Sequence, residues 1–155
     1  MNIDKIHLEK LEVFKTSNLK LFQFIQTRNN SRGYLHDDRE FDPWDFQATK
    51  VYLYCAETEY YGIINEHDVL IGYFRFHPRF NEIGMDLDLP FRDQGLGTKL
   101  YEKFLPKFWE LSNNELYLRV LKKNERALHV YNKLGFEIID ETDIDLQMKL
   151  FNYGI

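Results

Sequence analysis

The chain has 155 residues, of which 44% are hydrophobic and 29% are charged, and its formal net charge is −5. This composition is typical of a globular protein, and the length suits a single domain over residues 1–155. An acidic balance without a run of lysine or arginine argues against a nucleic-acid partner. No apolar run reaches membrane-spanning length and no apolar signal segment begins the chain, so we expect a cytoplasmic protein with no membrane partner.

The first half of the chain predicts a first helix, a loop with a second short helix, and several strands. Residues 6–14 are consistent with a first strand, and a helix capped by Thr16 or Ser17 should run to about Arg28. Segment 29–48 reads as a loop with a short helix, and its Trp44 and Phe46 either line a cleft or anchor packing. Alternating apolar residues then predict strands at 51–56, 60–65, 69–77 and 81–89.

Cys55 is the only cysteine, so neither an intramolecular disulfide nor a multi-cysteine metal site can form. Because it falls within the predicted strand 51–56, we expect a buried thiol rather than a nucleophile. The five histidines show no spacing typical of a zinc site, so no metal is expected.

The second half alternates helices with strands. Apolar residues recurring every four positions, from Leu96 to Phe108, predict an amphipathic helix. A strand at 116–120 follows, then a helix capped by Asn124 and ended by Gly135, and finally strands at 136–139 and 144–150. The elements together predict an α/β (α+β) fold with a mixed sheet.

A glycine-containing turn, 92–98, connects the strand at 81–89 to the following helix. Gly95 and Gly97 remove side chains, so several backbone N–H groups can point at one anion near the positive end of the helix dipole. An ordinary strand-to-helix turn is the alternative. The dinucleotide fingerprint would need a glycine at Leu100, and the Gly-Lys-Ser/Thr of the nucleoside triphosphate loop is missing.

The pattern Arg92-x-x-Gly95-x-Gly97 resembles the acetyl-CoA pyrophosphate loop of the GNAT superfamily of N-acetyltransferases. A second segment supports the resemblance, since Asn124 is followed by Tyr131 seven residues later and then by Gly135. The resemblance is strongest from about residue 59 to 151. It implies a GNAT-like mixed, mostly antiparallel sheet of six to seven strands flanked by about four helices, an N-acetyltransferase (acyltransferase) activity, and acetyl-CoA as the acyl donor.

The resemblance also assigns roles to individual residues. The strand at 81–89 would separate from its neighbour at 116–120 and offer its backbone to the pantetheine arm, and Asn124 would contact the same arm or act only as an N-cap. Tyr131 would act as general acid toward the CoA thiolate, although a buried core aromatic is the alternative. The cofactor-binding residues implied are Met85, Asp86, Leu87, Arg92, Asp93, Gln94, Gly95, Leu96, Gly97, Thr98 and Asn124.

The general base is less clearly indicated. Alternation along the strand places Glu82, Asp86 and Asp88 on one face. Glu82 is the first choice because many relatives carry a glutamate at the start of this strand, and Asp86 is the second. A solvated acidic face is the alternative. Another position where relatives place a glutamate holds Arg119 in this chain.

The predicted reaction is direct attack of a primary amine on the thioester, without a covalent enzyme intermediate. The net charge slightly favours a small-molecule amine over a peptide amine as acceptor. A homodimer is possible for this family. The alternative function is a non-catalytic CoA-binding sensor or interaction module of the same fold.

Overall fold

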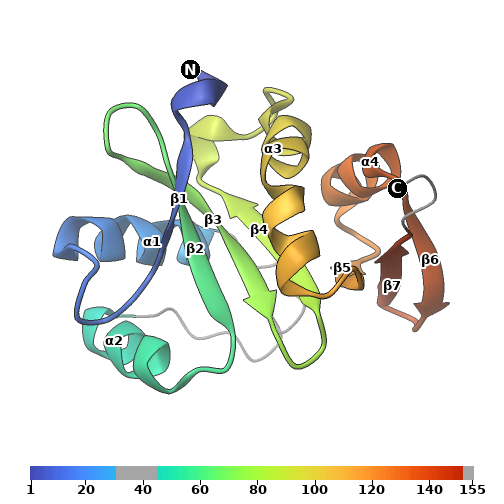
Figure 1. The fold of residues 1–155 in the computed structure, drawn as a ribbon, viewed down its shortest axis with the longest axis horizontal. Helices are drawn as coiled ribbons and strands as arrows, with labels where there is room; N and C mark the ends of the chain where they lie inside the picture. Colours follow the sequence, from blue (N-terminus) through green and yellow to red (C-terminus); the bar gives the residue numbers. More distant parts are fainter. Residues whose placement is uncertain (31–44, 152–155) are drawn as a thin grey trace.

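The computed structural model describes residues 1–30 and 45–151, which form a sheet with helices on both faces (Figure 1). The strands are β1 (His7–Lys10), β2 (Glu59–Ile64), β3 (Leu70–His77), β4 (Glu82–Leu87), β5 (Leu116–Leu121), β6 (Phe136–Glu141) and β7 (Asp145–Leu150). The helices are α1 (Asn18–Asn30), α2 (Phe46–Cys55), α3 (Leu96–Leu111) and α4 (Glu125–Leu134), with short 3-10 helices η1 (Ile3–Lys5) and η3 (Leu89–Phe91). The expected mixed fold is confirmed.

The sheet divides at its centre. Its strand order is β1-β2-β3-β4-β5-β7-β6, and every neighbouring pair is antiparallel except β4 and β5. These two run parallel and pair only at Glu82 and Tyr117. Beyond this point the remaining backbone of β4 pairs with no strand of the described residues on its β5 side, so the predicted separation of the two strands is confirmed.

Two hydrophobic cores lie on opposite faces of the sheet. Helices α1 and α2 cover a core that contains Phe24 and Tyr73, and α3 and α4 contribute to a larger core that contains Phe74 and Tyr131. Tyr73 and Phe74 are adjacent on β3 and point to opposite faces because successive strand residues alternate. The central strands are therefore buried on both sides.

The predicted strand at 51–56 is wrong, because these residues belong to α2 and to its C-cap. Asp45 starts the helix: its Oδ1 accepts a hydrogen bond from the Ala48 N–H at 2.7 Å. The alternation of aromatic and aliphatic residues mimicked a strand. The predicted buried thiol is also wrong, since Cys55 is exposed at the last position of this helix.

The other predicted elements are present with shifted ends. Ser17 rather than Thr16 precedes α1 as a cap, with its Oγ accepting from the Lys20 N–H at 3.3 Å. Most of segment 29–48, including Trp44, lies outside the described residues. Phe46 begins α2 and stacks on Phe22 with ring centroids 4.7 Å apart, which is a packing role.

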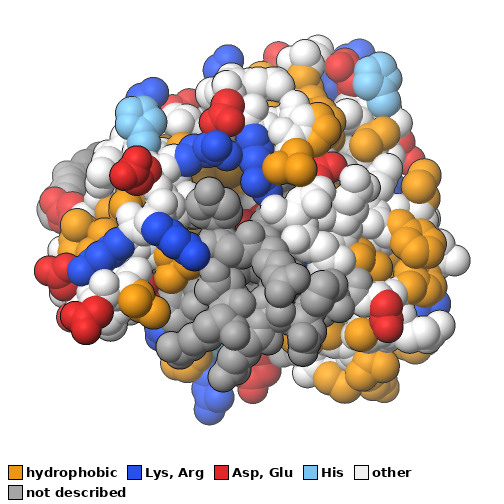
Figure 2. Space-filling model, turned by 180° about the vertical axis from the view of Figure 1, so that it is seen from behind, with side chains coloured by type: hydrophobic (Ala, Val, Ile, Leu, Met, Phe, Trp, Pro, Cys, Tyr) orange, Lys and Arg blue, Asp and Glu red, His pale blue; other side chains and the backbone are white. Residues whose placement is uncertain are grey.

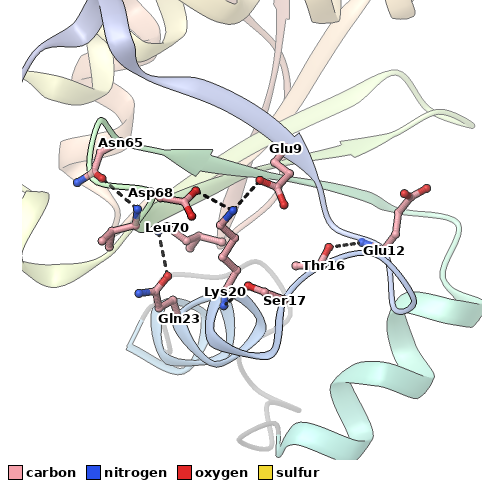
Figure 3. Close-up of polar contacts among 10 residues, drawn as sticks. Glu9, Glu12, Thr16, Ser17, Lys20, Gln23, Asn65, Asp68 and Leu70 are labelled. Atoms are coloured by element: carbon pink, nitrogen blue, oxygen red, sulfur yellow. Dashed lines mark hydrogen bonds and ion pairs between the residues drawn. The ribbon is translucent and has the colours of Figure 1, made fainter.

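Lys20 fastens α1 to the sheet (Figure 3). Its ammonium lies 2.9 Å from Glu9 Oε2 of β1 and 2.9 Å from Asp68 Oδ1 of the β2–β3 turn. One turn later, the Gln23 side-chain oxygen accepts a hydrogen bond from the Leu70 N–H at 3.0 Å. These contacts fix α1 against the start of β3.

The outer surface of α1 and α2 carries exposed apolar side chains. Seen from behind, hydrophobic side chains gather toward the right-hand edge, on the side of these two helices (Figure 2). Exposed members of the helices include Leu19, Phe22, Val51 and Tyr54. Within residues 1–30 and 45–151, no helix has the length and apolar character that crossing a membrane requires.

Candidate active site

A cavity of about 780 Å³ lies beside the unpaired part of β4, bordered by the loop before α3 and by α4. Its volume falls within the range of small-molecule and cofactor sites. The sequence-predicted residues that line it are Met85, Asp86, Leu87, Arg92, Asp93, Gly95, Leu96, Gly97, Thr98, Asn124 and Tyr131. Two predicted site residues, Glu82 and Gln94, are not among its lining residues.

The glycine loop adopts the backbone that an anion site needs. Asp93 and Gly95 have φ values of 61° and 70°, in the left-handed region. A Cβ added at Gly95 would meet nothing within 4 Å, so this glycine serves the backbone conformation and leaves open space beside it. A Cβ at Gly97 would lie 3.4 Å from Met85 Cε, so this glycine allows close approach to β4.

Helix α3 begins at this loop without a side-chain cap. The first N–H groups of a helix have no intrahelical acceptor, and the helix dipole adds partial positive charge there. An anion seated at Gly95–Gly97 would accept from these groups. The first turn of α3 is thus available to a phosphate.

Polar side chains brace the loop. The Arg92 Nε donates to the Leu87 carbonyl oxygen at 2.7 Å, and the Gln94 Nε2 donates to the Pro90 carbonyl oxygen at 2.8 Å. Arg126 of α4 pairs with Asp93 at 2.8 Å, joining the two sides of the cavity. Gln94 therefore supports the loop through its side chain.

Asn124 both caps α4 and lines the cavity. Its Oδ1 accepts a hydrogen bond from the Ala127 N–H at 3.2 Å, which confirms the N-cap role. At the other end, Gly135 stops the helix with a φ of 95°. Tyr131 lies two turns after Asn124, and the same side of the helix faces the cavity.

Tyr131 is buried, yet it forms part of the cavity wall. The Tyr101 hydroxyl of α3 donates a hydrogen bond to the Tyr131 oxygen at 3.2 Å. Burial raises the pKa of Tyr131, while the Tyr101 hydrogen bond and the Arg75 charge partly oppose that rise. Tyr131 is consequently a neutral phenol, with a proton to donate, at neutral pH.

The acidic residues of β4 are each paired with an arginine. Glu82 Oε1 lies 3.5 Å from Arg119 Nε, and Asp86 Oδ2 lies 3.4 Å from Arg75 Nε. Both carboxylates lie on the face of β4 opposite Met85, as alternation predicts. Asp88 departs from the prediction, because it follows the end of β4 and caps η3.

Gly84 lies between the two acidic residues and makes room for Arg75. A Cβ added at Gly84 would overlap the Arg75 guanidinium, which lies directly across from it in the β3–β4 register. The Arg75–Asp86 pair is therefore packed closely against β4.

Sequence reasoning missed Tyr101, Lys123 and Arg126 as lining residues. Tyr101 was hidden in the apolar stripe of its helix. A signal existed for the other two, since basic residues surround Asn124 at the start of α4. Within the described parts of the chain, no cluster of three or more His, Cys, Asp or Glu residues could hold a metal ion.

Comparison with known proteins adds a family and several structural likenesses. The model of the acetyltransferase (GNAT) family matches residues 21–136. The N-acetyltransferase PseH from Campylobacter jejuni, in complex with acetyl coenzyme A, is 19% identical with a TM-score of 0.70, over 96% of this chain and 99% of that one. Spermidine N-acetyltransferase from Vibrio cholerae, in complex with CoA and spermine, is 16% identical with a TM-score of 0.72, over 95% of each chain. No curated protein matches by sequence.

Proposed function

The chain belongs to the acetyltransferase (GNAT) family, whose members are N-acetyltransferases that use acetyl-CoA, and from this premise we propose how its cavity performs acetyl transfer. One observation carries the proposal. The glycine loop, the unpaired edge of β4 and the Tyr131 hydroxyl meet around a single cavity. Together they can hold a diphosphate, an extended amide-containing arm and a departing thiolate.

The diphosphate of acetyl-CoA would bind at the start of α3, accepting hydrogen bonds from backbone N–H groups within 93–98. Arg92, Lys123 and Arg126 add positive charge to the surrounding wall. From there the pantetheine arm would run back along β4 and pair with the backbone of 85–87. The Asn124 side-chain amide would contact the same arm while its oxygen caps α4.

The reaction begins when a neutral primary amine attacks the thioester carbonyl carbon. A C–N bond forms, the C–S bond breaks, and the amine gives up one proton. We assign Tyr131 as the donor that protonates the departing sulfur. Its hydroxyl accepts from Tyr101, and among the described residues no acceptor takes its own proton, which leaves that proton available to the cavity.

We assign Glu82 as the base that receives the amine proton. It stands where β4 and β5 join, which is the closed end toward which an arm anchored at Gly95 would extend. Because Glu82 does not line the cavity, the transfer would pass through an ordered water. Asp86 is the weaker candidate, since its mostly buried carboxylate is committed to the charge of the half-buried Arg75.

For the acceptor we propose a small-molecule primary amine rather than a peptide amine. The acidic net charge supports this choice, and a structural neighbour is described in complex with spermine. A cytoplasmic location and a homodimer are further proposals. Sedimentation velocity would test the latter, and the exposed apolar residues of α1 and α2 offer one surface for association.

The test combines acetyl-CoA binding with thiol release. Calorimetry should detect acetyl-CoA uptake, and a panel of small amines should include one that releases free CoA above the hydrolysis background. Uptake without release for any small amine or peptide would favour the alternative function, a CoA-binding sensor. Absence of uptake would overturn the proposal.

A further inference from the structure

The proposed proton donor has an energetic difficulty. An ordinary tyrosine has a pKa of about 10 and an alkyl thiol such as that of cysteine about 8.5, so a phenol is the weaker acid of the two. Burial raises the pKa of Tyr131 and widens that difference. Proton donation from Tyr131 to a thiolate therefore needs a group that stabilises the resulting phenolate.

The structure offers such a group in Tyr101. Its hydroxyl donates to the Tyr131 oxygen at 3.2 Å, and the contact is buried. The two rings meet edge to face with centroids 5.6 Å apart, while Tyr101 packs on Phe74 and Tyr131 on Phe136. This packing fixes both rings, so the two hydroxyls face each other without adjustment.

The direction of the hydrogen bond has two consequences. Because Tyr101 supplies its proton to the contact, the Tyr131 proton must point elsewhere, and the cavity lies beside it. A hydrogen bond to a charged oxygen is stronger than one to a neutral oxygen, so the same contact gains strength when Tyr131 loses its proton.

We propose that Tyr101 is a positioning residue for acetyl transfer, directing the Tyr131 proton into the cavity and stabilising the charge that develops on the Tyr131 oxygen. This inference rests on the proposed acid role of Tyr131. The leaving sulfur gains the Tyr131 proton, and the Tyr131 oxygen keeps the electron pair under the Tyr101 hydrogen bond. Solvent then returns a proton to Tyr131, and Glu82 releases to solvent the proton that it took from the amine, so the cycle balances.

Other charged groups act on this pair. Arg75 of β3 favours the ionised form of Tyr131, and Asp86 of β4 opposes it. The Arg75 and Asp86 charges lie 3.4 Å apart and have opposite signs, so their effects on Tyr131 largely cancel each other. The Tyr101 hydroxyl is the direct contact that remains.

Replacing Tyr101 by phenylalanine removes the hydroxyl and keeps the ring. In Tyr101→Phe, turnover at saturating acetyl-CoA should fall by roughly three- to tenfold, with little change in the KM for acetyl-CoA. Tyr61→Phe is the matched control, because Tyr61 is also buried and donates to Glu59 at 2.9 Å on another part of the core. The control should keep wild-type turnover.

A measurement that does not depend on turnover shows whether Tyr101 acts on the Tyr131 hydroxyl or only packs in the core. A 3-fluorotyrosine placed at position 131 gives one fluorine resonance, whose pH titration reports the pKa of that phenol. Tyr101→Phe should raise this pKa by roughly half a unit to one unit, and Tyr61→Phe should leave it unchanged.

A double-mutant cycle completes the test. If Tyr101 acts through Tyr131, then Tyr101→Phe should have no further effect on turnover in a Tyr131→Phe background. An unchanged titration, or an equal loss of turnover in both backgrounds, would overturn the inference. The titration is read without any acceptor, so failure of the proposed transferase function would be recognised separately, by the absence of CoA release.

Discussion

Tyr131 is the side chain whose removal bears most directly on the chemistry. Tyr131→Phe keeps the ring packed against Phe136 and removes only the hydroxyl. We predict that turnover falls at least about tenfold while acetyl-CoA affinity barely changes, because the proton is needed only as the sulfur departs. A timed assay of thiol release measures turnover, and calorimetry measures the affinity for acetyl-CoA. Unchanged turnover would remove Tyr131 from the mechanism.

The alkaline behaviour of the enzyme follows from the same residue. The pKa of Tyr131 is raised, chiefly by burial, so its donor form persists at pH values up to and above about 10. The alkaline loss of activity that comes from ionisation of Tyr131 should consequently lie above the ordinary tyrosine pKa of about 10.

Glu82 should control the acidic side of the pH–rate profile. A base must be ionised to accept the amine proton, so Glu82→Gln should lower kcat/KM and remove the acidic limb that Glu82 contributes. Glu102→Gln, on the exposed surface of α3, is the control and should keep the wild-type profile. If Glu82→Gln retains the wild-type acidic limb, another group or water alone acts as the base.

At the scale of elements, the two glycines of the loop before α3 have different roles: Gly95 allows a left-handed backbone, and Gly97 allows close approach to β4. Gly95→Ala places a Cβ on a left-handed residue, which costs about 1–2 kcal/mol, and directs it into the open space proposed for phosphate. Gly97→Ala meets Met85 Cε at 3.4 Å, a contact that a flexible side chain can relieve. We predict that Gly95→Ala weakens acetyl-CoA binding at least about tenfold and Gly97→Ala less, as calorimetry would measure. Equal, unweakened binding by both variants would contradict a loop-based anion site.

The sequence predicted elements well where periodicity was long. The stripe from Leu96 to Phe108 extends over several turns, so α3 was identifiable, as was α4 from its Asn124 cap and Gly135 stop. The short segment 51–56 alternated like a strand, and only the Asp45 cap outside it signalled a helix. Short apolar runs fit both periods, and caps then decide.

The candidate site was predictable where its function depends on backbone and not where it depends on packing. Glycines and a helix cap are visible in a sequence, so the loop and Asn124 could be placed in advance. The Tyr101–Tyr131 contact forms only when α3 and α4 pack together, and the arginine partners of Glu82 and Asp86 come from β5 and β3. The pattern of a single sequence does not indicate which side chains of distant elements come into contact.

For the whole molecule, Lys20 offers a test of how α1 is held to the sheet. Its side chain is 12% exposed and contacts carboxylates from two separate elements. The hydrogen bonds that the Lys20 ammonium donates to Asp68 and then to Glu9 raise the pKa of Lys20. Lys20→Met should lower the free energy of unfolding by about 1–2 kcal/mol at pH 7, less than a fully buried pair would because Asp68 is largely exposed.

The pH dependence of this loss follows from the direction of the shift. A lysine whose pKa is raised on folding stabilises the protein fully below its ordinary pKa of 10.5 and loses that contribution as pH rises through the folded value. The difference between wild type and Lys20→Met, measured by urea unfolding, should therefore shrink at strongly alkaline pH. Lys15→Met is the control, because Lys15 is 80% exposed and its pairing with Glu12 at 3.5 Å should contribute almost nothing. Equal losses for the two variants would mean that the Lys20 contacts do not anchor α1.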